Sequence, residues 1–184
     1  MKLPFISILI FWTGVAAAAD PHTQEIKLPD GEIIKNTVTT VDPSPQKIRI
    51  LNQRELSNIE AQSQMALDFV KYYFPKIQTP NLKDYDHAFR AWQVSQERKF
   101  SEAEVTQMLG SYLGNKCAAD LNMEWVEVTD KYGTEFAVRS KKVEVMSFPY
   151  AVVQKRIDNH QYDFISNVFH TVETMQRDGQ YKSR

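Results

Sequence analysis

The chain has 184 residues and a nearly balanced charge, with 22 Lys or Arg against 23 Asp or Glu and a formal net charge of −1 at pH 7. That balance argues against nucleic acid as a partner, because nucleic-acid-binding proteins usually carry a concentrated basic face. The single cysteine, Cys117, excludes an intramolecular disulfide. The length is sufficient for one sizeable hydrophobic core, so we expect one folded domain.

The first residues have the order of a secretory signal peptide. Lys2 precedes an uncharged, apolar run over 3–15, and four alanines follow at 16–19. We expect cleavage between Ala19 and Asp20. A signal anchor is the alternative, but the apolar run is shorter than the roughly 20 residues that span a membrane. The sequence therefore predicts a periplasmic or secreted protein with no stable membrane anchor after cleavage.

Residues 20–51 are expected to form an extended N-terminal arm. A continuous helix is excluded there by four prolines, Pro21, Pro29, Pro43 and Pro45. The sequence Leu-Pro-Asp-Gly at 28–31 is a turn signal, so a small hairpin and a flexible tether are both open for this part. The alternating residues at 48–50 are compatible with a short edge strand. The remaining residues, 52–184, are expected to form a single domain.

Two helices are predicted at the start of that domain. Apolar residues recur at spacings of three and four over 53–74, which indicates one face of a helix. Asn52 is suited to cap the N-terminus of this helix, and Pro75 lies just past its last turn. A second helix is expected to follow Pro80 and to end near Arg98.

Ser101 and Glu104 have the spacing of a capping box, which predicts the start of a third helix. The interior of this helix contains Gly110 and Gly114, although each glycine costs about 1 kcal/mol relative to alanine in a helix. Close approach of the helix to a sheet is the reason that we favour for these glycines. Cys117 lies on the apolar stripe of the same helix, so we expect a small buried side chain rather than a thiol nucleophile.

After residue 121 the hydrophobic period changes to 2, which indicates strands. The sequence Asp-Lys-Tyr-Gly at 130–133 is a hairpin turn in which Gly133 supplies a positive φ. A third strand over 143–146 completes a predicted three-strand antiparallel meander.

Two further helices are predicted after the meander. Pro149 suits the first turn of a short helix. A last helix is expected from about Asp163 to Arg177, with Gly179 beyond its end. The predicted fold class is α+β, with N-terminal helices packed on the small meander and C-terminal helices following it.

The run Met-Glu-Trp-Val-Glu-Val-Thr-Asp-Lys-Tyr-Gly-Thr-Glu-Phe-Ala-Val-Arg at 123–139 resembles the hairpin of the bacterial domain-of-unknown-function family 3806. Four dipeptides are also similar to that family, namely Leu-Gly at 109–110 and 113–114, Phe-Pro at 148–149 and Lys-Arg at 155–156. The likeness covers about residues 88–159, and Asn122 stands where the family has a glycine. The resemblance implies the α+β fold and brings no established activity.

The sequence contains no motif that would carry a named reaction. Its four histidines, His22, His87, His160 and His170, lack a metal-ligand spacing. A nucleophile elbow, a phosphate loop and a dinucleotide fingerprint are also absent from the sequence. We therefore predict no metal and no cofactor.

The candidate binding residues lie on the hairpin and in the segment after it. They are Trp125, Asp130, Tyr132, Glu135, Arg139, Lys155 and Arg156. Asp130 and Glu135 flank one turn, and two carboxylates at a suitable separation perform general acid–base catalysis. Turn chemistry explains the same residues, since Asp caps a turn and Tyr packs along a hairpin. For Trp125 we favour a place in the core over a ligand platform, and the basic pair at 155–156 is compatible with an anion contact or an ordinary helix surface.

These observations are compatible with two functions from different classes, a binding protein and an enzyme. The first is a non-catalytic envelope protein that binds another protein or a small ligand, an inhibitor or immunity-like role included, with the hairpin and residues 148–156 as its contact surface. The second is a hydrolase of envelope material that uses Asp130 and Glu135. A purely structural role predicts neither a partner nor a pocket.

Overall fold

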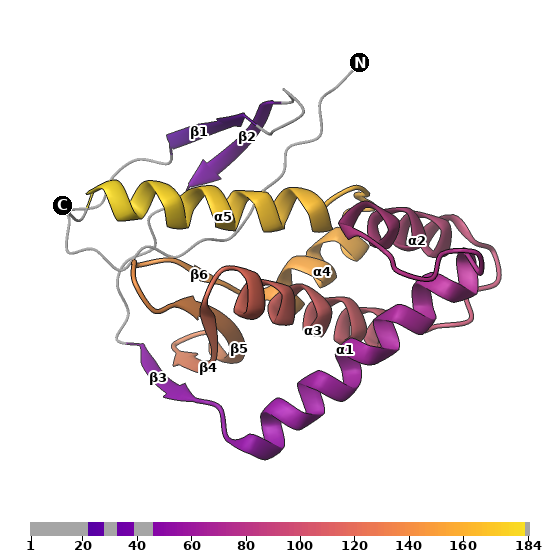
Figure 1. Cartoon of the computed structure of the whole chain (residues 1–184), viewed down its shortest axis with the longest axis horizontal. Helices are drawn as coiled ribbons and strands as arrows, with labels where there is room; N and C mark the ends of the chain where they lie inside the picture. Colours follow the sequence, from indigo (N-terminus) through magenta and orange to yellow (C-terminus); the bar gives the residue numbers. More distant parts are fainter. Residues whose placement is uncertain (1–21, 28–32, 39–45, 183–184) are drawn as a thin grey trace.

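The computed structural model describes residues 22–27, 33–38 and 46–182 (Figure 1). The predicted cleavage site at Ala19 and Asp20 and the predicted turn at 28–31 lie outside these residues. The strands are β1 (His22–Lys27), β2 (Ile33–Val38), β3 (Lys47–Ile50), β4 (Met123–Asp130), β5 (Gly133–Ser140) and β6 (Met146–Ser147). The helices are α1 (Gln53–Tyr73), α2 (Leu82–Val94), α3 (Glu102–Asp120), α4 (Pro149–Asp158) and α5 (Ile165–Lys182).

The main sheet has four antiparallel strands in the order β3-β4-β5-β6. The prediction of a three-strand meander was therefore wrong in strand count and in element order, because β3 precedes the helices in sequence and still pairs with β4. The backbones of β1 and β2 form a separate antiparallel pair. The expected third strand over 143–146 shrinks to two residues, since the Ser140 hydroxyl accepts hydrogen bonds from the N–H groups of Lys142 and Val143 and turns the chain.

The helix starts follow the predicted capping residues. Asn52 caps α1 and Ser101 caps α3, each in a capping box with the side chain three residues on. Asn81 caps α2 in the same way. The predicted end of α2 near Arg98 was wrong: the helix stops at Val94, and the Arg98 guanidinium folds back over the ring of Trp92, 4.6 Å from its centroid.

The last helix runs past its predicted end. α5 continues to Lys182, so Gly179 lies inside it and not beyond it. A Cβ on Gly179 would lie 3.1 Å from the Cβ of Val143, in the loop between β5 and β6. The glycine therefore marks a close approach between the helix and this loop, and not a helix stop.

The helix α3 is the centre of the domain, because it packs against α1, α4, α5, β4 and β5. Figure 1 places the sheet at one end of the molecule and α2 at the other. Side chains alternate between the two faces of a strand, and the sheet accordingly contributes to two apolar clusters. Trp125 and Val138 join the large helical core, whereas Val126, Val128 and Ala137 form a smaller cluster on the opposite face.

Within the described part of the chain, no helix is long and apolar enough to cross a membrane.

Candidate functional site

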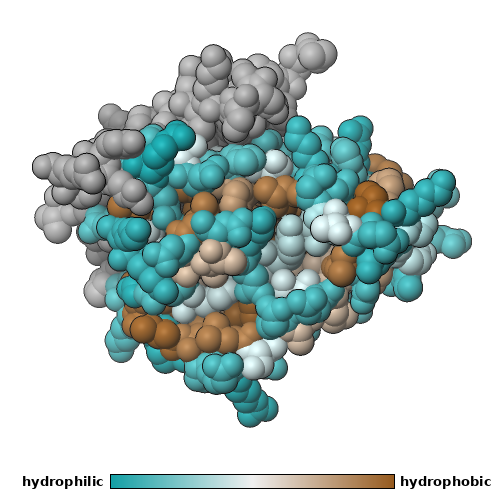
Figure 2. Space-filling model, viewed as in Figure 1, coloured by the Kyte–Doolittle hydropathy of each residue, from teal (hydrophilic) through white to brown (hydrophobic). Residues whose placement is uncertain are grey.

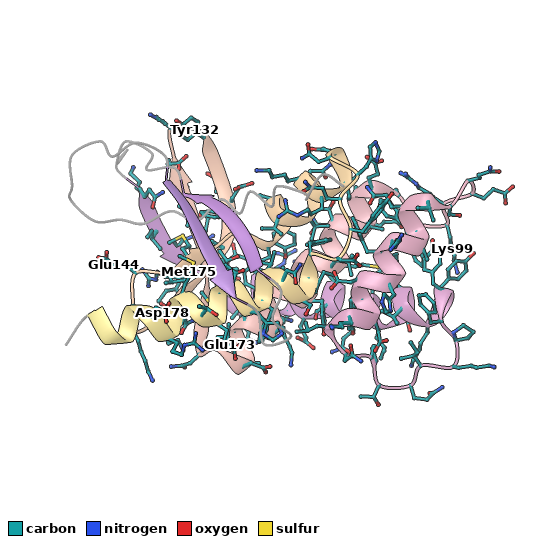
Figure 3. All side chains as sticks on the ribbon, turned by 90° about the horizontal axis from the view of Figure 1, so that it is seen from above. Lys99, Tyr132, Glu144, Glu173, Met175 and Asp178 are labelled. Carbon is teal, nitrogen blue, oxygen red and sulfur yellow. The ribbon has the colours of Figure 1, made fainter. Side chains whose placement is uncertain are left out.

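The hairpin between β4 and β5 is closed by local hydrogen bonds. The Asp130 carboxylate accepts a hydrogen bond from the N–H of Tyr132 at 2.8 Å, and Gly133 has a φ of 138°. The hydroxyls of Thr129 and Thr134 lie 2.9 Å apart across the strands. The Tyr132 side chain is 70% exposed and projects from the tip of the hairpin (Figure 3). The tip therefore combines a fixed backbone with an exposed aromatic ring.

The two candidate carboxylates lie on the same face of the hairpin. The register pairs Asp130 with Gly133 and Glu135 with Val128, and paired residues share a face of the sheet. Desolvation, followed by the negative charge of Asp130, raises the pKa of Glu135. Asp130 is already engaged in the turn. Neither the groove beside Arg139 nor the groove beside Tyr112 and His170 includes this pair.

Trp125 belongs to the core. Its side chain is 5% exposed, and its indole N–H donates to the Oδ1 of Asn115 at 2.8 Å. The ring lies against Gly114 of α3 and 5.8 Å, centroid to centroid, from the ring of Tyr150 on α4. The tryptophan is thus held by both helices and faces away from solvent.

Arg139 lines a groove of about 430 Å³ on the sheet. Its guanidinium forms an ion pair with the carboxylate of Glu124 at 2.6 Å. The groove is lined by Gln46, Ile48, Glu124 and Arg139, and by residues 140–146. Lys141 and Lys142 place two exposed ammonium groups at this groove.

The basic pair on α4 is divided between surface and core. The Arg156 side chain is 1% exposed, with its guanidinium 6.0 Å from the ring centroid of Phe164, and burial lowers its pKa to about 10. Lys155 is half-buried, and desolvation, with a smaller effect of Arg156, lowers its pKa. The seven candidate residues therefore do not form one cluster: Asp130, Tyr132 and Glu135 lie together, Arg139 lines a groove, and Trp125 and Arg156 are buried.

The expected short edge strand at 48–50 is present as β3, and two of its apolar side chains are exposed, which was not predicted from the sequence. Ile48 and Ile50 of β3 are 39% and 63% exposed, beside the hairpin that ends in Tyr132. The alternation of apolar and charged residues in Lys47–Ile50 predicted a short edge strand, but not its pairing with β4 or the exposure of its apolar side chains. Figure 2 shows apolar surface at the end of the molecule that contains the sheet.

Cys117 lies on the buried side of α3. The thiol is buried, and burial raises its pKa to about 12. Among the described residues, no group of three His, Cys, Asp or Glu side chains is placed to hold a metal ion.

A family model described as Domain of unknown function (DUF3806) matches residues 87–169. The predicted resemblance is confirmed over this segment. The matched segment runs from α2 into α5 and contains all of α3, the hairpin, β6 and α4. It excludes β3, so Ile48 and Ile50 lie outside the family match, whereas Tyr132 lies inside it.

A solved structure from Bacteroides thetaiotaomicron VPI-5482 is also similar to the chain. It shares 11% sequence identity, with 82% of this chain and 68% of that chain covered and a TM-score of 0.49. At that level the likeness supports no argument about function. No curated protein matches the chain.

Proposed function

We propose that the chain is a non-catalytic protein-binding module of the bacterial envelope, exported to the periplasm or beyond, that contacts its partner through the hairpin tip and β3. Blocking a toxin or a hydrolase belongs to this class. The export signal at 1–19 supports the compartment. An exposed apolar surface beside polar residues is typical of a protein interface.

One observation carries this proposal. Six large hydrophobic side chains are exposed among the described residues, and three of them, Ile48, Ile50 and Tyr132, lie on β3 and the adjoining hairpin tip. Lys47 pairs with Thr129, three residues before Tyr132, so the strand and the tip share one margin of the sheet. Aromatic residues are enriched in protein interfaces, and Tyr132 is the most exposed of the six.

The test is affinity capture from native envelope extract with matched variants. Ile50→Lys should reduce the retained partner at least about tenfold, because burying an unpaired ammonium in an interface is unfavourable. Val94→Lys is the control, since Val94 is 62% exposed on α2, at the other end of the molecule. Tyr132→Ala, compared with Tyr72→Ala, should also lose the partner. Equal recovery with Ile50→Lys and Val94→Lys would contradict the proposed surface.

A hydrolase of envelope material is the second candidate, and one feature favours it, the raised pKa of the exposed Glu135 beside Asp130. A raised pKa beside a second carboxylate is the arrangement that a general acid uses. Under this alternative, the protein releases soluble fragments from purified envelope polymer, and Glu135→Gln slows the release at least about a hundredfold. Glu144→Gln is the control, because Glu144 is an exposed acid of the loop between β5 and β6. Release that is absent, or unaffected by Glu135→Gln, would exclude the alternative.

A further inference from the structure

The outer edge of β3 exposes main-chain groups as well as side chains. β3 is the margin of the sheet, with β4 on its inner side. The N–H of Leu51 donates to the carbonyl of Trp125 at 3.5 Å, directly beyond the pair of Ile50 with Val126. In an antiparallel ladder, hydrogen-bonded and non-hydrogen-bonded pairs alternate. Leu51 and Trp125 form a hydrogen-bonded pair, so the pairs of Ile50 with Val126 and Ile48 with Val128 are non-hydrogen-bonded, and the N–H and carbonyl groups of Ile48 and Ile50 point away from β4. The Ile50 carbonyl also accepts a long hydrogen bond, 3.4 Å, from Nη1 of Arg49.

We propose that the protein partner contributes an extended strand that pairs with this outer edge of β3. The inference rests on the proposed function and names how the partner is held. Strand addition to an open sheet edge uses main-chain hydrogen bonds for affinity and alternate side chains for specificity. Ile48 and Ile50 supply both the main-chain hydrogen-bonding groups and the side-chain contacts, because their main chains point outward and their side chains are exposed on one face.

The chemistry of β3 defines the strand that fits. Residues opposite Ile48 and Ile50 share their face of the sheet and are apolar. The charged residues of β3 lie on the other face. Arg49 is already held there by the carboxylates of Glu55 and Glu127, each at 2.8 Å. Lys47 is exposed and forms no ion pair with any described residue. We therefore expect the partner strand to place an acidic side chain beside Lys47, where the two form an ion pair. Such a strand alternates apolar residues, opposite Ile48 and Ile50, with acidic residues on the other face.

A second copy of the chain fits this edge less well. When Ile48 of one copy pairs with Ile50 of the other, Arg49 lies opposite the same residue of the second copy. When Ile48 pairs with Ile48, Lys47 lies opposite Arg49. The four carboxylate oxygens of Glu55 and Glu127 already accept hydrogen bonds from Arg49. Arg49 with Glu55 and Glu127 carries one positive and two negative charges, a net charge of −1, so two such clusters face and repel each other when Ile48 pairs with Ile50. A foreign strand with an acidic residue beside Lys47 avoids this repulsion.

The test uses short peptides selected from a random displayed library on the exported protein, with counter-selection on Ile50→Lys. Enriched peptides should alternate apolar and acidic residues, and their binding should slow amide hydrogen exchange at Ile48 and Ile50. Ile50→Pro removes one outward donor and no bond to β4, so it should weaken binding about tenfold. Ile50→Val keeps the donor and the branched apolar side chain and should bind as the wild type does. Thermal unfolding of each variant establishes that the fold is retained.

The outcomes separate the binding mode from the binding surface. Peptides that bind wild type and Ile50→Pro equally, without protecting the two amides, would overturn strand pairing and leave the surface proposal standing. A library that yields no peptide preferring wild type over Ile50→Lys would overturn both. A wild-type dimer that forms with increasing concentration, and that Ile50→Pro abolishes, would show that a second copy occupies the edge and would overturn the foreign strand.

Discussion

Gly114→Ala is expected to lower the free energy of unfolding by about 2 kcal/mol. A methyl group on Gly114 would overlap the indole of Trp125, which is held in place by the ring of Tyr150 on α4 and by its hydrogen bond to Asn115. Forcing extra volume into a packed core costs about 3 kcal/mol, and the gain in helix propensity returns only about 1 kcal/mol. Urea unfolding of the two proteins, followed by circular dichroism, measures the difference.

Two companion variants show whether the overlap is the cause. Gly179→Ala places its methyl 3.1 Å from Val143, a tight contact that a small shift relieves, so it should change the stability by less than about 1 kcal/mol. Trp125→Phe makes room beside α3, so Gly114→Ala should cost less in that background than in the wild type. A penalty of the same size in both backgrounds would show that the glycine is required for another reason.

The sequence predicted those features of the fold that depend on neighbouring residues. Asn52 and Ser101 cap their helices because a side-chain oxygen reaches a backbone N–H only three residues away. Gly133 closes the hairpin for an equally local reason, its positive φ. The expected close approach at Gly114 is confirmed against the sheet residue Trp125, whereas Gly110 meets Tyr150 of α4 instead.

Features that depend on long-range contacts escaped prediction. β3 joins the sheet through partners such as Glu127, which binds Arg49 across 78 residues of sequence. A four-residue strand carries too little periodicity to show which strand it pairs with. The N-terminus of α5 is likewise capped by Asp86 of α2, 79 residues earlier. Capping rules read within three or four residues of a helix start cannot find such a partner.

The same distinction between local and long-range contacts decided which parts of the candidate site could be predicted. Asp130, Tyr132 and Glu135 were placed correctly at the turn, because turn chemistry is local. The burial of Arg156 had a signal in the sequence: it lies three and four residues after Val153 and Val152, on the apolar face of α4. Its basic side chain was interpreted as a surface contact in spite of that position. The exposure of Ile50 had no such signal, since an apolar residue in a strand is as easily buried.

Asp86→Ala is expected to lower the free energy of unfolding by about 3 kcal/mol. The buried Asp86 carboxylate accepts hydrogen bonds from the N–H groups of Ile165 at 2.6 Å and Ser166 at 3.1 Å, and so caps α5 from α2. Alanine leaves two buried donors without this acceptor, and each unsatisfied donor costs about 1–3 kcal/mol. Urea unfolding at about pH 4, where the carboxyl group of the folded protein is protonated, measures the loss. Hydrogen exchange should show faster opening at the start of α5 than in α1, which Asp86 does not cap.

The charge of Asp86 adds a pH dependence to this contact. Burial, with a smaller contribution from the negative charge of Asp163, raises the pKa of Asp86 from 3.8 to about 6 in spite of the two N–H donors. Because the folded state holds the proton more tightly than the unfolded state, the stabilisation is complete below about pH 4 and is lost as the pH rises through about 6. A difference of this size corresponds to about 3 kcal/mol. Asp86→Asn has no such titration, so the stability of the wild type relative to this variant should fall by about that amount between pH 4 and pH 7. A constant difference over that range would mean that Asp86 is ionised throughout, with its charge fully compensated by the N-terminus of α5.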